Sequence, residues 1–162
     1  MKTKKQGIEY SLIAAIADNF VIGNGLKIPW HISEDFKLFK ERTLNNVIIM
    51  GKNTWDSLPI KPLPNRINIV LSKDEIEING CFVATSLTQA FAEASKYDKE
   101  IFVIGGASIY AQTIETAKYL YISHVKGNFE GNIFFPKFDK SKYKVVEEKE
   151  FDKFIFKKYE KL

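Results

Sequence analysis

One acidic side chain, Asp35, falls on the apolar side of a predicted helix. At helical spacing Ile32, Phe36 and Phe39 form one face, and Asp35 lies three residues after Ile32 and four before Phe39. Burial raises the pKa of a carboxyl group, which suits protonation chemistry or pairing with a cationic, amidine-like ligand edge. From the spacing alone, the favoured interpretation is that Asp35 caps the N-terminus of this helix, and Glu34 is expected in solvent.

Two glycine turns follow predicted strands and precede predicted helices. Gly51 leads into Lys52, and Gly105–Gly106 leads into Ala107. Free N–H groups at a helix start suit a phosphate. The position five before Gly51 is Asn46, so the Walker A pattern is absent, and the second turn lacks the full dinucleotide-binding spacing. Each turn alone is compatible with a structural role, whereas together they suggest a ligand with several phosphates.

Arg66 follows the rigid turn Pro62–Asn65 at the start of a predicted strand. Of the 24 basic residues only Arg42 and Arg66 are arginine, so each guanidinium needs its own explanation. The planar fork of Arg66, held by such a turn, suits a carboxylate. An ordinary surface ion pair is an equally open interpretation.

The elements that must position these residues alternate between apolar runs and helical patterns, as in βα units. Predicted strands are Tyr10–Ala17, Asn46–Met50, Ile67–Leu71, Cys81–Ala84, Ile101–Ile104 and Tyr119–Val125, and predicted helices are Ser33–Thr43, Thr54–Leu58, Leu87–Ser95 and Ala107–Ile114. Tyr143–Glu150 and Lys153–Lys161 predict an antiparallel hairpin. The fold class is therefore α/β, a central twisted, mostly parallel sheet of about eight strands with an antiparallel C-terminal edge hairpin and about four flanking helices.

Length and composition bound the possibilities. The 162 residues and 45% hydrophobic content predict a single domain over residues 1–162 with a sizeable core. A net charge of +4 leaves open nucleic acid, a membrane surface or a small anionic ligand. Lone Cys81 fits a reducing, cytoplasmic compartment, and no Cys/His cluster has metal-ligand spacing. The apolar run Tyr10–Ala17 is too short for a membrane anchor, and no signal peptide is expected.

The ordered set of segments resembles the dihydrofolate reductase family. The match runs from about Tyr10 to Pro136, with weaker similarity through the C-terminal hairpin. It is carried by Ser11–Ala15, Val21–Gly23, Ile28–Trp30, Asp35 with Phe39, Ile49–Trp55, Pro62–Arg66 and Ile104–Gly106. The joint order of these pieces is highly specific.

The resemblance implies an enzyme that moves hydride from NADPH to C6 of 7,8-dihydrofolate while N5 is protonated. The product, 5,6,7,8-tetrahydrofolate, supplies one-carbon metabolism. By similarity Asp35 hydrogen-bonds the 2-amino group and N3 of the pterin, Ser123 joins through water, and the carboxylate favours protonation at N5 electrostatically. The proton is expected from a water admitted near Ile28 and Trp30, which with Asp35 make up the catalytic group of residues.

The same resemblance assigns substrate contacts. Arg66 would take the α-carboxylate of the glutamate tail. The remaining residues implied in binding the pterin and aminobenzoate are Ile13, Ala15, Phe39, Leu58, Ile104, Tyr110 and Ser123.

The cofactor contacts are implied in the same way. Lys52, Ser72 and Lys73 would meet the 2′-phosphate, which implies NADPH rather than NADH. The residues expected at the pyrophosphate are Asn53, Thr54, Gly106, Ala107, Ser108 and Ile109, and further cofactor contacts are Ala15, Ile22, Gly23, Leu71, Ile104 and Gly105. The Gly105–Gly106 peptide bond is expected to be cis.

Residues 22–28 are expected to form a mobile loop that closes over the nicotinamide and excludes water. Here the sequence departs from the family pattern. Ile28 replaces a frequent methionine or leucine, and Asn132 and Ile133 replace an Asp-Thr pair, which places the loop's closed-state hydrogen bonds in question. Ala107 for a third glycine and Ser123 for threonine are milder changes.

Three alternatives remain at this point. A related pterin or flavin-precursor reductase would keep the cofactor features without needing both Asp35 and Arg66. A nucleic-acid binder needs a clustered basic stripe with exposed aromatics, whereas the lysines here are scattered. A noncatalytic NADPH or folate carrier has no need of a carboxylate in its pocket. We therefore expect a cytoplasmic, monomeric enzyme that binds dihydrofolate and neither nucleic acid nor membrane.

Overall fold

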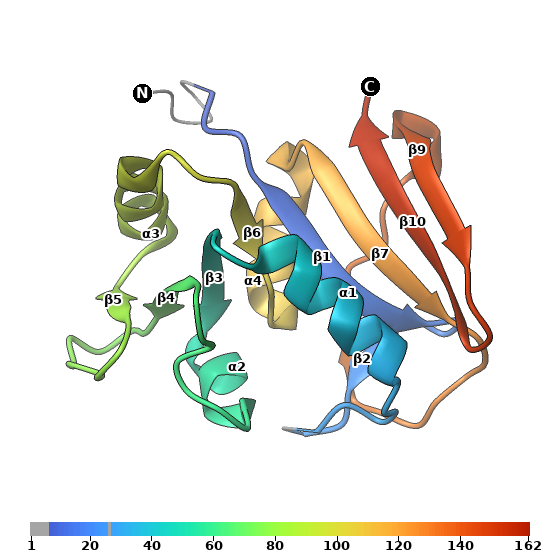
Figure 1. The fold of residues 1–162 in the computed structure, drawn as a ribbon, viewed down its shortest axis with the longest axis horizontal. Coiled ribbons are helices and arrows are strands. Elements are labelled where there is room, and N and C mark those ends of the chain that lie inside the picture. The colour runs from blue at the N-terminus through green and yellow to red at the C-terminus, as the bar shows by residue number, and fades with distance from the viewer. Residues whose placement is uncertain (1–6, 26) are drawn as a thin grey trace.

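A computed structural model of the protein describes residues 7–25 and 27–162, and it is built on one eight-stranded sheet (Figure 1). The strand order is β5-β4-β3-β6-β1-β7-β10-β9. Pairing is parallel from β5 to β7 and antiparallel at β7–β10 and β10–β9, which confirms the predicted fold class. The strands are β1 (Ser11–Ala17), β3 (Val47–Gly51), β4 (Ile67–Leu71), β5 (Phe82–Ala84), β6 (Ile101–Val103), β7 (Tyr119–Val125), β9 (Tyr143–Glu150) and β10 (Phe154–Lys161).

Four α-helices flank the sheet, close to the predicted positions. They are α1 (Ser33–Thr43), α2 (Lys52–Ser57), α3 (Leu87–Ala94) and α4 (Ala107–Thr113), with short 3₁₀ turns at Ser95–Tyr97, Ile114–Thr116 and Lys140–Lys142. Helix α2 begins two residues before the predicted Thr54, because Gly51 is still extended and the chain turns helical at Lys52.

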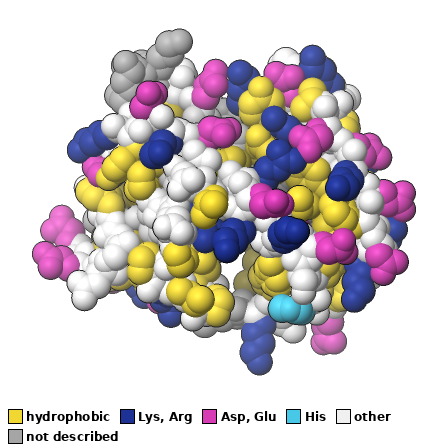
Figure 2. Space-filling model, viewed as in Figure 1, with side chains coloured by type: hydrophobic (Ala, Val, Ile, Leu, Met, Phe, Trp, Pro, Cys, Tyr) yellow, Lys and Arg dark blue, Asp and Glu magenta, His cyan; other side chains and the backbone are white. Residues whose placement is uncertain are grey.

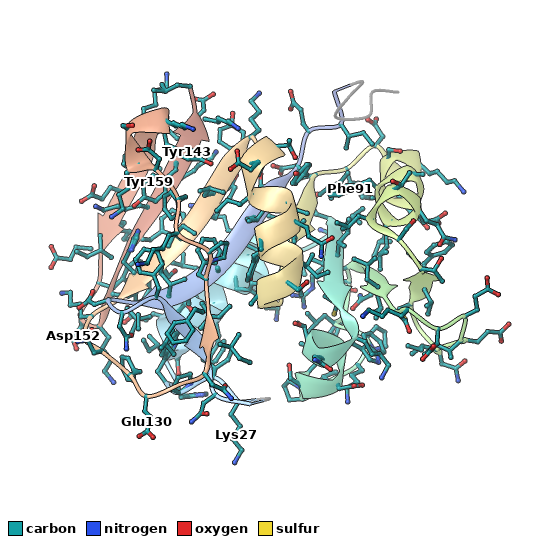
Figure 3. All side chains as sticks on the ribbon, turned by 180° about the vertical axis from the view of Figure 1, so that it is seen from behind. Lys27, Phe91, Glu130, Tyr143, Asp152 and Tyr159 are labelled. Carbon is teal, nitrogen blue, oxygen red and sulfur yellow. The ribbon has the colours of Figure 1, made fainter. Side chains whose placement is uncertain are left out.

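The core has two halves, one on each face of the sheet. Along β3, Val47 and Ile49 join one cluster while Ile48 and Met50 join the other, as strand alternation requires. The first cluster packs against α3 and α4, which lie over the face seen in Figure 3. The second lies on the face covered by α1 (Figure 1) and includes Trp55 of α2. Both faces are covered, so the inner strands are apolar throughout.

The prediction that Ile32, Phe36 and Phe39 form one apolar face of α1 is only partly confirmed. Phe36 is 42% exposed, and its ring lies against the ring of His31, with centroids 5.0 Å apart. The inward residues are Leu38 and Phe39, both half-buried. The helix is capped by Ile32 without a side-chain hydrogen bond, so Asp35 is not a cap.

A second, two-stranded sheet was not predicted. It pairs β2 (Val21–Gly23) with β8 (Ile133–Phe134) and ties the start of the 22–28 loop to the 131–135 segment. Leu26 of that loop lies outside the described residues. Residues 1–6, at the N-terminus where no signal peptide is expected, lie outside them as well. Within the part of the chain that the structure describes, no helix is long and apolar enough to cross a membrane.

Basic and acidic side chains are interspersed over the face that carries α1 (Figure 2). That face shows no continuous basic stripe of the kind that a nucleic-acid backbone requires. The described basic side chains on this face are therefore separated by acidic and uncharged ones.

Candidate active site

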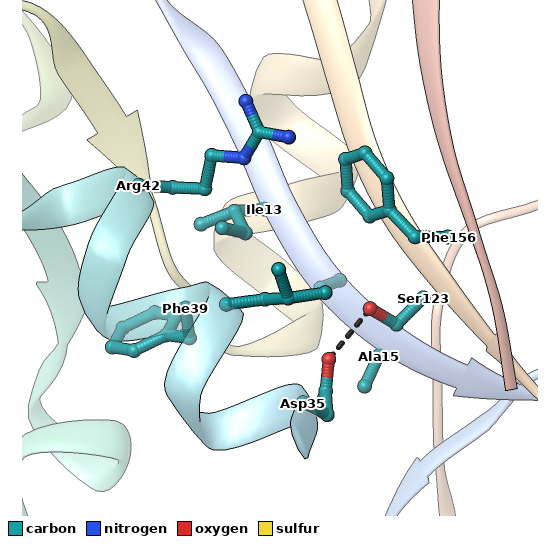
Figure 4. A pocket seen from close by; sticks show the side chains of 9 residues that line it. Ile13, Ala15, Asp35, Phe39, Arg42, Ser123 and Phe156 are labelled. Atoms are coloured by element: carbon teal, nitrogen blue, oxygen red, sulfur yellow. Dashed lines mark hydrogen bonds between the residues drawn. The ribbon is translucent and has the colours of Figure 1, made fainter. Parts of the chain in front are cut away.

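A small cavity of about 50 Å³ lies between α1 and the strands β1, β7 and β10 (Figure 4). Strand register builds its floor, because Ala15 is paired with Ser123, and Ser123 with Phe156, in one row across three strands. Residues directly opposite each other on paired strands point to the same face of a sheet. The lining residues are Ile13, Ala14, Ala15, Asp35, Leu38, Phe39, Arg42, Ser123 and Phe156. Five residues predicted to bind the substrate, Ile13, Ala15, Asp35, Phe39 and Ser123, are thus brought together.

Asp35 is joined directly to Ser123. The Ser123 hydroxyl donates a hydrogen bond of 2.6 Å to Asp35 Oδ1. Burial raises the pKa of Asp35, and the Ser123 hydrogen bond opposes that rise in part. The cavity therefore contains a carboxyl group that is desolvated, oriented and able to accept further hydrogen bonds.

The sequence analysis missed Ala14, Leu38, Arg42 and Phe156 as lining residues. Leu38 was not predicted because helical spacing favoured Phe36 as an inward residue. Phe156 reaches the cavity only because β10 pairs with β7 in the observed register, for which no local signal exists. Arg42 could have been identified as a candidate from the sequence, because it is one of only two arginines in the chain.

Arg66 is held in a fixed orientation beside the C-terminal end of α1. Its Nε donates to the Pro64 carbonyl at 3.0 Å and its Nη1 to Thr43 Oγ1 at 3.2 Å. Buried Asn68 closes the preceding turn through hydrogen bonds to Leu63 and to the Arg66 carbonyl. Partial burial lowers the pKa of Arg66. Among the described residues no ion pair includes Arg66, so its remaining N–H groups suit an external anion.

The two glycine turns meet at the carboxyl ends of the adjacent strands β3 and β6. Gly51 N donates to Gly105 O at 2.8 Å, and the Gly105–Gly106 peptide is cis, as expected. A Cβ at Gly106 would stand 3.5 Å from Thr54 Oγ1, so Gly106 lies beside the hydroxyl of Thr54 on α2. Crevices outside the carboxyl ends of parallel strands are where α/β sheets bind nucleotides, so these residues fit a pyrophosphate.

The cations expected at a 2′-phosphate flank these turns. Lys52 is half-buried, and its Nζ forms an ion pair of 2.7 Å with Asp56, one turn further along α2. Lys73 is exposed beyond β4, and Ser72 Oγ accepts a hydrogen bond from Asp74 N at 3.3 Å. Asn53 and Ser108 are exposed, and Thr54, Leu71, Ala107 and Ile109 are half-buried.

Several predicted contacts lie outside the small cavity. Leu58 and Ile104 are half-buried against the same core cluster as Ile13. Tyr110 is buried behind β1, where its hydroxyl donates to the Ile13 carbonyl at 2.7 Å and so supports the cavity wall. Ile28 is 53% exposed. Trp30 stands edge-on to Phe129, with centroids 5.1 Å apart, beside a second cleft of about 350 Å³.

Asn132 forms two hydrogen bonds with the 22–28 loop. Asn132 Oδ1 accepts a hydrogen bond of 2.9 Å from Gly25 N, and Asn132 N donates to Gly23 O at 3.1 Å. The loop approaches so closely that a Cβ at Gly131 would lie 2.4 Å from the Gly23 carbonyl oxygen. Ile22, half-buried, packs against the core beside this contact. The amide of Asn132 therefore holds the loop through its side-chain carbonyl.

Comparisons with known proteins agree with this arrangement. The family model described as dihydrofolate reductase matches residues 9–161. The chain is 47% identical over 128 residues to the dihydrofolate reductase of Buchnera aphidicola subsp. Acyrthosiphon pisum, covering 79% of each chain. It is 43% identical to that of Neisseria meningitidis over 144 residues, covering 88% of each chain.

A solved structure gives the same result in three dimensions. Dihydrofolate reductase from Enterococcus faecalis, complexed with NADP(H) and RAB-propyl, superposes with a TM-score of 0.87 at 30% identity. The match covers 94% of this chain and 96% of that one. The chain therefore belongs to the dihydrofolate reductase family, and the activity that goes with this membership is NADPH-dependent reduction of dihydrofolate.

Proposed function

We propose that the cavity around Asp35 holds the pterin ring of dihydrofolate and that Asp35 anchors it. The observation that carries this proposal is a desolvated carboxyl group, oriented by Ser123 at 2.6 Å, in a cavity whose other walls are apolar side chains and Arg42. The 2-amino group and N3 of a pterin form an amidine-like edge, which a carboxylate can engage with two hydrogen bonds. Ile13, Ala15 and Phe39 then contact the faces of the ring.

Arg66 binds the α-carboxylate of the glutamate tail. Its orientation by Pro64 and Thr43 leaves donors of the guanidinium for a two-point contact with a carboxylate. Because Thr43 also donates to the Phe39 carbonyl at 2.8 Å, the end of α1 that contacts Arg66 is joined to the wall of the cavity. Leu58, half-buried against the same core cluster as Ile13, contacts the aminobenzoyl group, while Tyr110 and Ile104 complete the inner wall.

NADPH, when bound, supplies the hydride that C6 of the pterin accepts. The residues that would hold its pyrophosphate are Asn53, Thr54, Gly106, Ala107, Ser108 and Ile109, and Gly105 is a further contact. Lys52, Ser72 and Lys73 bind the 2′-phosphate, with Leu71 beside them, and Ala15, Ile22, Gly23 and Ile104 line the nicotinamide side. The meeting of the two glycine turns at the carboxyl ends of β3 and β6, beside Thr54, supports this assignment.

The chain's own residues control the proton that N5 must gain. The negative charge of Asp35 raises the pKa of N5 on the bound ring, because opposite charges favour each other in a desolvated site. Ile28 and Trp30 sit at the edge of the loop where one water can enter and protonate N5. The 22–28 loop, held by Asn132, keeps other water out during hydride transfer.

We also propose that residues 1–162 form one domain that works as a monomer in the cytoplasm. Strand β9, at one edge of the sheet, carries Lys144, Glu147, Glu148, Lys149 and Glu150, and charged side chains on an edge strand discourage pairing with a second copy. Molar-mass measurement in solution tests this part.

The test of the function is oxidation of NADPH followed with dihydrofolate as acceptor. The proposal expects turnover with dihydrofolate, and little turnover with a flavin precursor in its place. If the purified chain bound both NADPH and dihydrofolate without turnover, it would be a carrier and the proposed chemistry would be wrong.

A further inference from the structure

Helix α1 carries four of the residues that line the cavity, but it is weakly anchored along its length. All eleven of its residues are described, and only Thr43, the last, is fully buried. Asp35 and Phe39 line the cavity that separates the helix from the sheet. The middle of the helix packs against the core through Leu38 and Phe39, which are only half-buried because they also line the cavity. Contacts at the two ends of the helix therefore help to set its distance from β1 and β7.

Arg42 forms the contact at the C-terminal end. Its Nη2 donates to Glu147 Oε2 on β9 at 2.5 Å. The guanidinium carbon lies 5.5 Å from the ring centroid of Tyr121 on β7 and 5.1 Å from that of Phe156 on β10. One side chain of α1 therefore contacts three strands of the sheet.

Arg42 and Asp35 stand on the same face of α1. They are seven residues apart, which is close to two turns, or about 10 Å along the axis. Both line the cavity, with Asp35 near Ser123 at one end and Arg42 beside Phe156 at the other (Figure 4). The helix is thus joined to the sheet at both ends of the cavity.

The chemistry of the contact requires arginine. A guanidinium lies flat against aromatic faces while its edge donates to a carboxylate, and an ammonium group cannot do both. The Arg42 and Glu147 side chains are 30% and 44% exposed, so the ion pair alone would contribute little. The two rings partly desolvate the cation and strengthen both interactions.

We propose that Arg42 is a positioning residue for the substrate cavity, fastening the C-terminal turn of α1 to β7, β10 and β9. It thereby fixes the separation of Phe39 and Asp35 from Ile13 and Ser123. This inference rests on the proposed binding of the pterin in that cavity. The groups assigned to the cofactor's phosphates lie on α2, on α4 and beyond β4, so loss of the contact affects dihydrofolate and leaves NADPH binding nearly unchanged.

The test compares Arg42→Met, which keeps an apolar chain over the rings, with Lys37→Met, an exposed position on the same helix. For Arg42→Met we expect the KM for dihydrofolate to rise about three- to tenfold, the range for contacting residues, and the KM for NADPH to change by less than about twofold. Arg42→Lys should recover only part of the loss. Lys37→Met should behave like the wild type.

Glu147→Gln keeps the proposal testable if Arg42→Met does not fold. It breaks only the ion pair, so a smaller rise confined to the KM for dihydrofolate is expected. The Arg42→Met/Glu147→Gln double variant should raise this KM by a factor smaller than the product of the two single factors. Equal rises in both KM values, or no rise for dihydrofolate, would show that Arg42 has a general structural role and overturn the inference. Asp35→Asn, measured alongside, distinguishes this from an error in the cavity assignment, because a fully active Asp35→Asn would overturn the pterin site itself.

Discussion

Ser123 on β7 donates a hydrogen bond of 2.6 Å to Asp35 on α1, across the cavity that separates the helix from the sheet. The two residues are 88 positions apart in the chain. This bond orients the Asp35 carboxyl group. Burial raises the pKa of Asp35 and so favours its uncharged form, whereas the Ser123 hydrogen bond opposes that rise in part. The same carboxyl group is therefore a cost to folding and the proposed anchor of the substrate.

That cost predicts a stabilised variant. Because the pKa of Asp35 is higher in the folded protein, its contribution to stability is fully present below the pKa of the unfolded chain and is lost as pH rises through the folded-state pKa. Asp35→Asn removes the ionisable group, and with it the loss of stability at higher pH, while keeping an acceptor for the Ser123 hydroxyl. Thermal unfolding without ligand should give a higher Tm for the variant at pH 7, with the difference shrinking as the solution is made acidic. A lower Tm at pH 7 would mean that the ionised carboxyl group stabilises the fold.

His124 predicts a fall in stability toward acidic pH. Burial, together with the charges of Lys140 and Lys157, lowers the pKa of His124 to about 4, and Tyr159 hydrogen-bonds its Nε2 at 2.8 Å. The contribution of neutral His124 is present above the unfolded pKa of about 6.5 and is lost as pH falls toward 4. His124→Gln should flatten the dependence of Tm on pH in this window, whereas His31→Gln, at an exposed position, should not. Parallel curves for His124→Gln and the wild type would refute this account.

Arg66→Leu should weaken binding of the glutamate tail. A charge-assisted two-point contact contributes about 1.5–3 kcal/mol, so the KM for dihydrofolate should rise about 10- to 100-fold. A reduced pterin without the glutamate serves as the control substrate, and its KM should be the same for both proteins. A comparable loss with both substrates would mean that Arg66 supports the cavity rather than the carboxylate.

Lys52 and Lys73 should distinguish NADPH from NADH. Replacing both by Ala removes the charges assigned to the 2′-phosphate, so the KM for NADPH should rise about tenfold or more while that for NADH changes little. Lys99→Ala, at an exposed position elsewhere, provides the matched control. Equal losses for the two cofactors would contradict the phosphate role.

Asn132 should matter for closure of the 22–28 loop. Asn132→Ala removes the acceptor for Gly25 N, and the loss of one such hydrogen bond predicts a kcat about two- to tenfold lower. Asn132→Asp restores an acceptor at the same position and should recover most of the rate, while Asn128→Ala, on the exposed neighbouring turn, should have no effect. A wild-type kcat for Asn132→Ala would show that this bond does not hold the loop in the rate-limiting state.

Local patterns were sufficient to predict most of the framework. Continuous apolar runs gave the inner strands, and helical spacing placed α1 at Ser33–Thr43 with Asp35 on its inner side. The strands β2 and β8, of three and two residues, are too short to leave a periodic signal. Phe36 was wrongly placed inward because helical spacing does not reveal that a cavity, rather than a closed core, lies beneath α1.

The part of the site that escaped prediction depends on long-range register. Phe156 reaches the cavity because it is paired with Ser123, and Glu147 reaches Arg42 because it is paired with Lys158. A shift of one residue in either pairing would turn these side chains to the opposite face. Such registers are set by packing of the whole sheet, so neither contact can be read from the residues near it.

The most direct test of the central claim is the turnover of dihydrofolate and NADPH by wild type and Asp35→Asn at neutral pH. If the Asp35 carboxylate anchors the pterin and favours protonation at N5, the variant should lose at least about 100-fold in kcat/KM. The loss should diminish at acidic pH, where solvent protonates N5 without help from the carboxylate. Full activity of Asp35→Asn at neutral pH, in a protein that unfolds cooperatively, would contradict the claim.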